Sequence, residues 1–121
     1  TWSNEQLPGL EELYEEFKEK GIEEIFCVSV NDSFVMNAWA KDIGIKKVKM
    51  IPDGNGEFTR DMDMLVFKPA QNFGYRSWRY AMVINDMKVE KMFIEEGKNQ
   101  MGLDEDPYEV TKPENILKNL L

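Results

Sequence analysis

The sequence predicts an α/β domain, a three-layer α/β/α sandwich with a central mixed sheet. Helical and strand patterns alternate along most of the chain, one apolar run is buried on both faces, and two alternating runs later in the chain form a hairpin. A run that is apolar on both faces is typical of a central parallel strand covered by helices. Residues 1–121, with 42% hydrophobic side chains, are therefore interpreted as one domain with one core.

The first half of the chain predicts two helices and two strands. Residues 7–20 carry apolar side chains at spacings of three and four, which indicates an amphipathic helix. "EIFCVSV" at 24–30 predicts the central strand, and "NDS" after it supplies turn and cap chemistry for a helix over 34–43. "KKVKMI" at 46–51 predicts a second strand, which the turn sequence "PDGNGEF" ends. This alternation predicts strands that run parallel and are joined by a crossover helix.

The second half predicts a short helix, a hairpin and a final helix. Residues 58–65 indicate the short helix, and 69–76 an irregular loop. "WRYAMVIND" followed by "MKVEKMFIEE" predicts a hairpin that turns through Asn85 and Asp86. A final helix begins with Thr111 as its cap and Pro113 in its first turn. No strand precedes the first helix, so we expect an N-terminal hairpin and the first central strand, about 40 to 50 residues, to lie upstream of this sequence.

Composition excludes several classes of partner and site. The net charge of −8 and the pI near 4.6 argue against a nucleic acid or an anionic membrane as the partner. No apolar run approaches the length of a membrane span. A single cysteine, Cys27, excludes an internal disulfide and favours a reducing compartment, which predicts a cytoplasmic protein unless a targeting segment precedes Thr1. The absence of histidine excludes Ser-His and Cys-His catalysis and the usual zinc sites from this stretch.

Two further candidates for chemistry have structural interpretations. "DGNGE" places Asp53 at the first position of a calcium loop, but Phe58 replaces the required glycine and Met64 the closing glutamate, so we predict a turn and no metal site. Cys27 lies in the middle of a strand pattern, where a thiol behaves as a small buried hydrophobe, so it is interpreted as a structural thiol.

The stretch "FGYRSWRYA" places arginines around a strand that otherwise belongs to the core. Alternation puts Arg79 on the same face as Ala81 and Val83, an unfavourable place for an unpaired guanidinium. Two interpretations remain open. Arg79 meets an anion, a thiolate or a polar ligand, or it is an edge arginine paired with one of the many acidic side chains.

Several of these segments together resemble the peroxiredoxin family, in its type II branch, and most strongly the members fused to a glutaredoxin domain. The matching segments are "LPGLEELYEEFKEKGIEEIFCVSVNDSFVMNAWAKD", "IPDGNGEFTRDMDMLV" and "RSWRYAMVINDMKVEKMFIE". The resemblance runs from about Ser3 to Leu121 and implies a thioredoxin-like fold. It also implies a peroxidase that reduces hydrogen peroxide and alkyl hydroperoxides through a cysteine thiolate, without a cofactor.

The resemblance assigns roles to individual residues. Arg79 matches the arginine that clamps the thiolate and the peroxide, Arg76 a second arginine that supports the site, and Phe73 an apolar residue beside the substrate. Counting back from "LPG", Trp2 occupies the position of the peroxidatic cysteine, and Thr1 lies beside it in the pocket. Two explanations compete. The catalytic cysteine lies just upstream, or Trp2 replaces it and the chain is a catalytically silent binding module.

The resemblance also suggests partners. No resolving cysteine occurs in the sequence, so the reductant is expected to be an external thiol: glutathione, glutaredoxin or thioredoxin. Family members commonly pair through the face around the active site. The segment 34–39 and the loop at Phe73 are the candidate surface for a homodimer.

Overall fold

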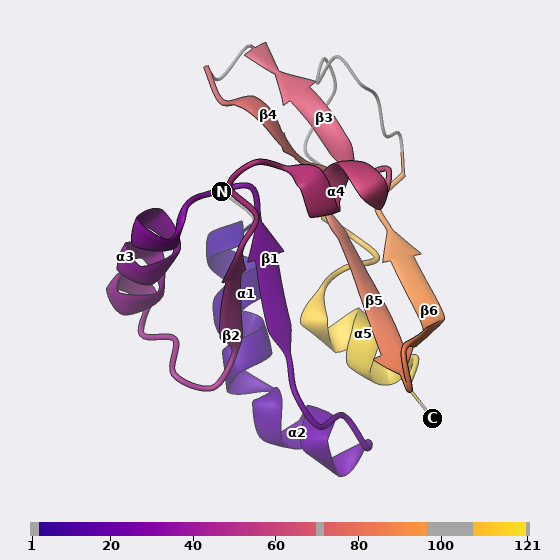
Figure 1. Ribbon diagram of the computed structural model, residues 1–121. Helices are drawn as coiled ribbons and strands as arrows, with labels where there is room; N and C mark the ends of the chain where they lie inside the picture. Colours follow the sequence, from indigo (N-terminus) through magenta and orange to yellow (C-terminus); the bar gives the residue numbers. More distant parts are fainter. Residues whose placement is uncertain (1–2, 70–71, 97–107, 121) are drawn as a thin grey trace.

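The computed structural model describes residues 3–69, 72–96 and 108–120 of the chain (Figure 1). Two helices begin this part, strands and short helices follow, and a last helix closes it. Its elements in order are α1 (Ser3–Glu12), α2 (Tyr14–Glu19), β1 (Phe26–Ser29), α3 (Ser33–Ile43), β2 (Lys49–Pro52), α4 (Glu57–Asp61), β3 (Leu65–Lys68), β4 (Gly74–Ser77), β5 (Tyr80–Asn85), β6 (Lys88–Ile94) and α5 (Pro113–Lys118).

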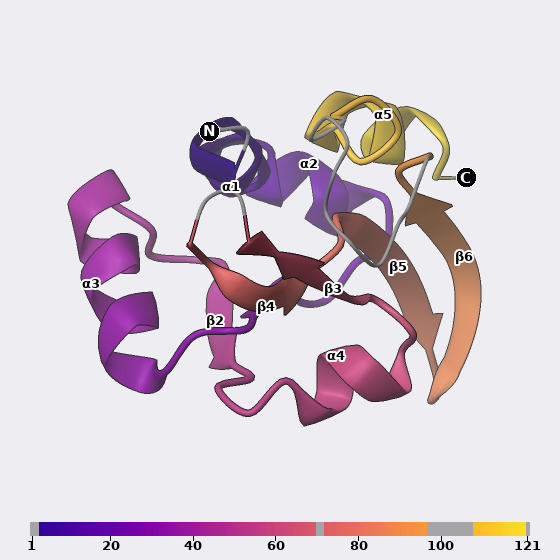
Figure 2. The same cartoon turned by 90° about the horizontal axis from the view of Figure 1, so that it is seen from above.

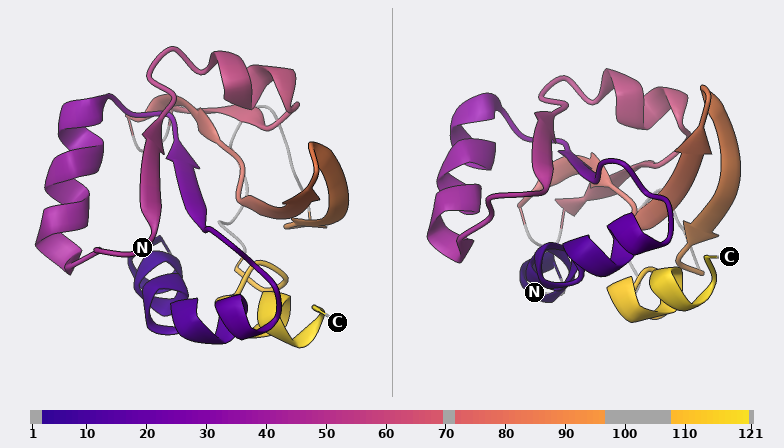
Figure 3. Two further views of the ribbon diagram at one scale, coloured as in Figure 1. Left: turned by 60° about the horizontal axis from the view of Figure 1, so that its bottom comes forward. Right: turned by 90° about the horizontal axis from the view of Figure 1, so that it is seen from below.

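The elements form layers around the strands. Seen from above, α1, α2 and α5 lie together on one side of the strands, and α4 lies on the opposite side (Figure 2). The views from below show the same division, with α3 beyond β2 at the edge of the molecule (Figure 3). The α/β layering agrees with the predicted fold class, and it places the amphipathic N-terminal and C-terminal helices beside each other.

Strand pairing is mixed, as predicted, but it falls into three separate pairs. β1 and β2 are parallel, with Cys27 opposite Met50, while β3 with β4 and β5 with β6 are antiparallel. Within the described residues these pairs do not join into the continuous central sheet expected from the sequence. The main-chain groups along the free edges of β1 and β5 therefore have no strand partner in the described part of the chain.

The predicted helix over residues 7–20 is two helices, because the chain bends at Leu13 (φ −92°, ψ 7°). The two helices share two core clusters. Leu7 of α1 packs with Tyr14 of α2 and with Val48, and Phe17 of α2 packs with Ile116 of α5. Periodicity identified the apolar faces but not the break between the helices.

Two other boundaries were wrong. The helix predicted over 58–65 ends at Asp61, and Leu65 begins β3. The segment 69–76, predicted as a loop, contains most of β4, which pairs with β3 so that Val66 faces Arg76. These two strands form an antiparallel pair that the local pattern did not indicate, so their pairing identifies them.

Capping was predicted correctly for α3 and wrongly for α5. The Asp32 carboxylate accepts the main-chain N–H of Val35 at 2.8 Å, and Gly44 ends α3 with a left-handed φ of 73°. The N-cap of α5 is Lys112, not Thr111, and the hydroxyl of Thr111 instead donates to Glu95 at 2.6 Å. The Thr111 hydroxyl, which the local sequence assigned to the cap of the helix, thus binds the carboxylate of Glu95, 16 positions earlier in the chain.

The aspartate of the "DGNGE" turn, Asp53, binds groups of the protein itself. Asp53 accepts the main-chain N–H of Thr59 at 2.8 Å and its hydroxyl at 2.6 Å, which fixes the first turn of α4. Among the described residues, no group of three or more Asp, Glu, Cys or His side chains is arranged to hold a metal ion.

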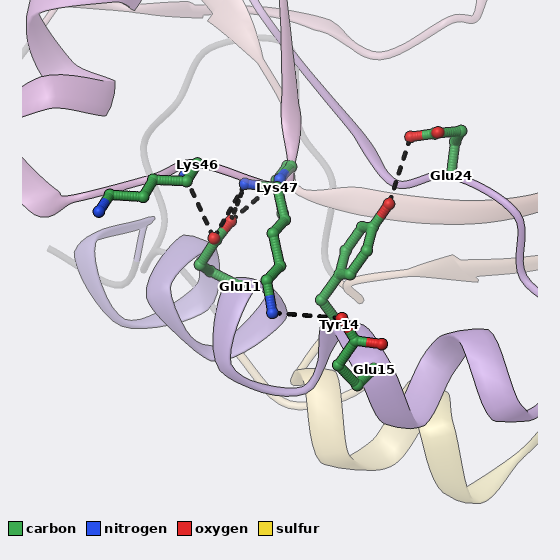
Figure 4. Close-up of polar contacts among 7 residues, drawn as sticks. Glu11, Tyr14, Glu15, Glu24, Lys46 and Lys47 are labelled. Carbon is green, nitrogen blue, oxygen red and sulfur yellow. Dashed lines mark hydrogen bonds and ion pairs between the residues drawn. The ribbon is translucent and has the colours of Figure 1, made fainter.

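A carboxylate fixes α1 to the loop before β2. Glu11 accepts main-chain N–H groups from residues 46–48, at distances between 2.9 and 3.1 Å (Figure 4). Burial raises the pKa of Glu11, but these hydrogen bonds outweigh burial and hold the pKa below its usual value. Lys47 adds an ion pair to Glu15 at 3.3 Å, so the N-terminal helices are tied to the β1 and β2 pair by polar contacts as well as by packing.

Candidate active site

Arg79 directly precedes β5, and its side chain reaches toward the helical layer that contains α1. Its Nη1 donates to Oε1 of Gln6 at 2.9 Å. Its guanidinium carbon lies 5.5 Å from the centre of the Tyr108 ring, within the range of a cation–π contact. Alternation correctly placed Arg79 on the face of Ala81 and Val83, which pack in the cluster of α2 and α5. The guanidinium thus contacts an amide and an aromatic ring.

Gln6 connects Arg79 to the segment before α5. Gln6 is the fourth residue of α1, and its Nε2 donates to the carbonyl oxygen of Thr111 at 3.1 Å. The amide therefore presents its donor end to Thr111 and its acceptor end to Arg79. The guanidinium consequently lies against the N-terminal part of α1.

Gln6 and Tyr108 were not identified from the sequence. One signal was available for Gln6, because it follows Trp2 by four positions in the sequence, a spacing that puts two side chains on one face wherever a segment is helical. Tyr108 follows an acidic stretch, and nothing local indicates that its ring meets an arginine 29 positions earlier. Burial and the charge of Glu114 raise the pKa of Tyr108 to about 12, while Arg79 acts in the opposite direction. The phenol is therefore neutral at physiological pH.

Behind Arg79 lies a buried acid, Glu95, with 2% of its surface exposed. Its carboxylate accepts the main-chain N–H of Glu109 at 3.0 Å, and the main-chain N–H and hydroxyl of Thr111 at 2.9 and 2.6 Å. Burial raises the pKa of Glu95, but the hydrogen bonds from Thr111 and Glu109 outweigh it and hold the pKa below its usual value. A charged carboxylate thus fixes the segment that faces Arg79.

Arg76 and Phe73 contact each other at the β3 and β4 hairpin. The guanidinium carbon of Arg76 lies 5.6 Å from the centre of the Phe73 ring, and its Nη1 donates to the carbonyl of Tyr75 at 3.1 Å. Phe73 is 48% exposed. These contacts join the two predicted site residues to each other, whereas Arg79 contacts Gln6 and Tyr108.

Cys27 lies in β1, where the strand predicted from the sequence placed it. Burial raises the pKa of its thiol to about 11, so the thiol is neutral at physiological pH. The side chains of Trp78 and Trp39 also pack in the core. Trp78 is buried with Met64 and Val66, and Trp39 packs against the cluster that contains Leu7. Trp2 and Thr1, the residues matched to the catalytic position and its neighbour, lie outside the described residues.

The geometry suits an anion at the start of α1. The N-terminal end of a helix carries partial positive charge, and the Arg79 guanidinium adds a full charge beside the same helix. A forked guanidinium can donate to two neighbouring acceptors, such as a thiolate and an oxygen of a bound substrate. An arrangement of this kind can stabilise a thiolate and can orient a small polar molecule against it.

Comparison with known proteins identifies the family. The Redoxin family profile matches residues 3–110. A peroxiredoxin from Rhizobium etli is 60% identical over 115 residues, which are 95% of this chain. The chain belongs to the peroxiredoxin family. A hybrid peroxiredoxin from Haemophilus influenzae is 49% identical over 99% of the chain. This identity is lower than the 60% identity to the Rhizobium etli protein. A solved peroxiredoxin structure superposes with a TM-score of 0.89 at 40% identity, covering 94% of this chain and 68% of that one.

This peroxiredoxin chain spans 64% of the length of the Rhizobium etli relative and 48% of the hybrid relative. The thioredoxin-like α/β fold predicted from the sequence is confirmed by the superposition. None of the helices in the described residues is long and apolar enough to cross a bilayer.

Proposed function

We propose that this chain is part of a thiol-dependent peroxidase that reduces hydrogen peroxide and alkyl hydroperoxides. One observation carries the proposal: the Arg79 guanidinium lies against α1 between Gln6 and Tyr108. In the reaction, a cysteine thiolate attacks one peroxide oxygen and the O–O bond breaks. The thiolate becomes a sulfenic acid, and the leaving oxygen takes a proton to become water or an alcohol. The similarity to peroxiredoxins over 95% of the chain supports the same chemistry.

Arg79 has two roles in this proposal. It lowers the pKa of the attacking thiol, because a nearby cation stabilises the thiolate more than the thiol. It also orients the peroxide, because its fork donates to the oxygen atoms on which charge develops in the transition state. Arg76, with Phe73 stacked on it, supports the apolar rim beside the substrate.

The attacking cysteine in this proposal belongs to a segment upstream of Thr1, which also adds a strand between β1 and β5. Two observations support it. The chain spans less than two thirds of the bacterial relatives' length, and β1 and β5 each have an edge without a strand partner among the described residues. Cys27 is assigned a structural role, because its raised pKa opposes thiolate formation.

A second candidate is a catalytically silent relative in which Trp2 occupies the position of the peroxidatic cysteine. The observation in its favour is that the sequence contains one cysteine, Cys27, whose pKa of about 11 leaves it neutral. In this case Arg79 and the start of α1 form a binding site for a small anion or a polar partner instead of a catalytic centre.

Peroxide consumption by the protein from the intact gene tests the proposal. Glutathione with glutaredoxin, and thioredoxin with its reductase, are supplied in turn as the reductant. We expect consumption with at least one donor, and a rate constant for peroxide about 10²- to 10³-fold lower in Arg79→Met. Arg60→Met is the matched control, because Arg60 is exposed in α4 and pairs only locally with Asp61. Its rate constant is expected to stay unchanged.

Two results would contradict the peroxidase proposal. Intact protein that consumes no peroxide with any donor favours the silent relative, and recovery of activity in Trp2→Cys would then identify a lost catalytic position. An Arg79→Met variant as active as Arg60→Met would remove Arg79 from the mechanism.

The remaining proposals concern assembly and location. Phe34 is 84% exposed at the start of α3, and with Phe73 it supports a homodimer through segment 34–39 and the loop at Phe73. Solution scattering on the intact protein, with Phe34→Glu as the variant, measures whether a dimer forms and dissociates. A cytoplasmic location is proposed from the single reduced cysteine.

A further inference from the structure

The residue after β6, Glu95, holds the main chain of Arg79 in place. Its main-chain N–H donates to the carbonyl of Arg79 at 3.3 Å, and its own carbonyl accepts the indole N–H of Trp78 at 2.7 Å. Trp78 is 3% exposed, so this pairing is anchored in the core. Glu95 therefore fixes the point on the main chain from which the Arg79 side chain leaves.

The side chain of Glu95 holds a second segment, residues 108–111. Its carboxylate accepts hydrogen bonds from neutral donors of Glu109 and Thr111. An ionised carboxylate with several such donors is stabilised in its charged form even when it is buried. This segment is linked to the guanidinium twice: directly through the Tyr108 ring, and through the Thr111 carbonyl that binds Gln6.

The two ends of the Gln6 amide bind different partners. A primary amide has a donor end and an acceptor end, and the Thr111 carbonyl takes the donor end at 3.1 Å. The acceptor end is thereby left facing Nη1 of Arg79, at 2.9 Å. A shift of the Thr111 carbonyl would turn or displace the amide, and the guanidinium would lose one of the partners that orient it.

We propose that Glu95 is a positioning residue, which sets the orientation of the Arg79 guanidinium through Tyr108 and through Thr111 and Gln6. The effect of Glu95 on the reaction rate rests on the proposed peroxidase function, whereas its effect on the orientation of Arg79 does not. A guanidinium at the end of a flexible side chain stabilises a transition state effectively only when its N–H groups already point at the oxygen atoms on which charge develops. Misplacement of a catalytic group by about 1 Å can cost about 10²-fold in rate.

The test compares Glu95→Gln with Glu96→Gln in the intact protein. The two substitutions remove the same charge from adjacent residues, and Glu96 is exposed. The glutamine amide at position 95 places an N–H group against the donors of residues 109–111, so this segment shifts. In Glu95→Gln we expect the ¹H–¹⁵N signals of the Gln6 carboxamide and the Arg79 guanidinium to move, and those of the β1 and β2 pair to stay. The rate constant for peroxide is expected to fall about ten- to hundredfold. Glu96→Gln is expected to leave both readouts unchanged.

A second pair of variants covers the case in which Glu95→Gln does not fold. Thr111→Val keeps the shape of the side chain and removes only the hydroxyl that donates to Glu95 at 2.6 Å, whereas Thr111→Ser keeps that hydroxyl. We expect Thr111→Val to move the Gln6 and Arg79 signals and to slow the reaction. Thr111→Ser is expected to restore most of both.

The outcomes separate the two proposals. If the Gln6 and Arg79 signals keep their wild-type positions in Glu95→Gln or in Thr111→Val, the positioning role is wrong, whatever the activity. If the signals move and the rate constant does not change, Glu95 orients Arg79 without effect on catalysis, and the catalytic role is wrong. If the signals move in a protein that never consumes peroxide, the positioning role stands and the peroxidase proposal fails.

Discussion

Glu11 and Glu95 are two carboxylates with similar partners and different surroundings. Each accepts main-chain N–H groups from a segment distant in the sequence, and hydrogen bonding holds the pKa of each below its usual value. Glu11 lies at a partly exposed joint between α1 and the loop before β2 (Figure 4). Glu95 is buried behind Arg79. The difference shows how one kind of contact stabilises a scaffold at one site and orients a functional side chain at the other.

The comparison predicts that removal of Glu95 is the more damaging change. Glu95→Ala removes the acceptor of the buried N–H and hydroxyl of Thr111, and of the partly buried N–H of Glu109. We expect the free energy of unfolding to fall by about 3 kcal/mol. Urea denaturation at pH 7 measures it, with Glu96→Ala as the exposed control. A loss below about 1 kcal/mol would mean that water reaches this site and that the two carboxylates are equivalent.

Acid should weaken both contacts. The pKa of each carboxyl is lower in the folded than in the unfolded protein, where a glutamate titrates near 4.3. Each group therefore contributes stability above that pH, and the contribution is lost as the pH falls through the folded value. We expect the wild type to lose more stability between pH 5 and pH 3 than Glu95→Gln does. Parallel stability curves for the two proteins would show that Glu95 does not titrate with a lowered pKa.

Removal of Glu11 should cost less. In Glu11→Ala the N–H groups of residues 46–48 lose a charged acceptor, but water can replace it because the joint is partly exposed. We expect a loss of about 1 kcal/mol in unfolding free energy. The Arg79 and Gln6 signals should not change, because Glu11 contacts a different segment. Movement of those signals would show that the joint and the Arg79 site are coupled through α1.

Cys27 is a partly buried acid to compare with these carboxylates, and desolvation alone raises the pKa of its thiol, to about 11. In the folded protein its thiol is expected to react with iodoacetamide at pH 8 at least tenfold more slowly than in urea, because little thiolate forms. Mass spectrometry of the alkylated peptide gives the rate. Equal rates in the two states would show that β1 opens readily.

Local patterns predicted much of the scaffold. Asp32 of the "NDS" segment caps α3, as predicted, and the runs on either side of Asn85 form the β5 and β6 hairpin. The hairpin turn itself falls one residue later than predicted, because Asp86 and Met87 adopt the positive φ angles that the turn needs. The strands β3 and β4 were missed or misassigned, although β1 and β2, which are also four residues long, were predicted.

The site was predicted less completely than the scaffold. Alternation alone placed Arg79 on the inward face, because a strand period of two leaves a single choice of side. The sequence left open whether that guanidinium meets a ligand or a carboxylate. The guanidinium contacts the Gln6 amide and the Tyr108 ring, and the Glu95 carboxylate acts one step further back, through Thr111.

By itself, then, the sequence determined the family, the α/β layering and the inward direction of Arg79. The order of the motifs, the apolar periodicity and the strand alternation each depend on residues that are close together in the sequence. Only the tertiary structure decided what Arg79 meets. Gln6 and Arg79 are 73 positions apart, and Glu95 and Thr111 are 16 apart. A hydrogen bond forms only when its donor and acceptor lie at the right distance to within a few tenths of an ångström. Such distances are set by how the helices and strands pack, and no local pattern records them.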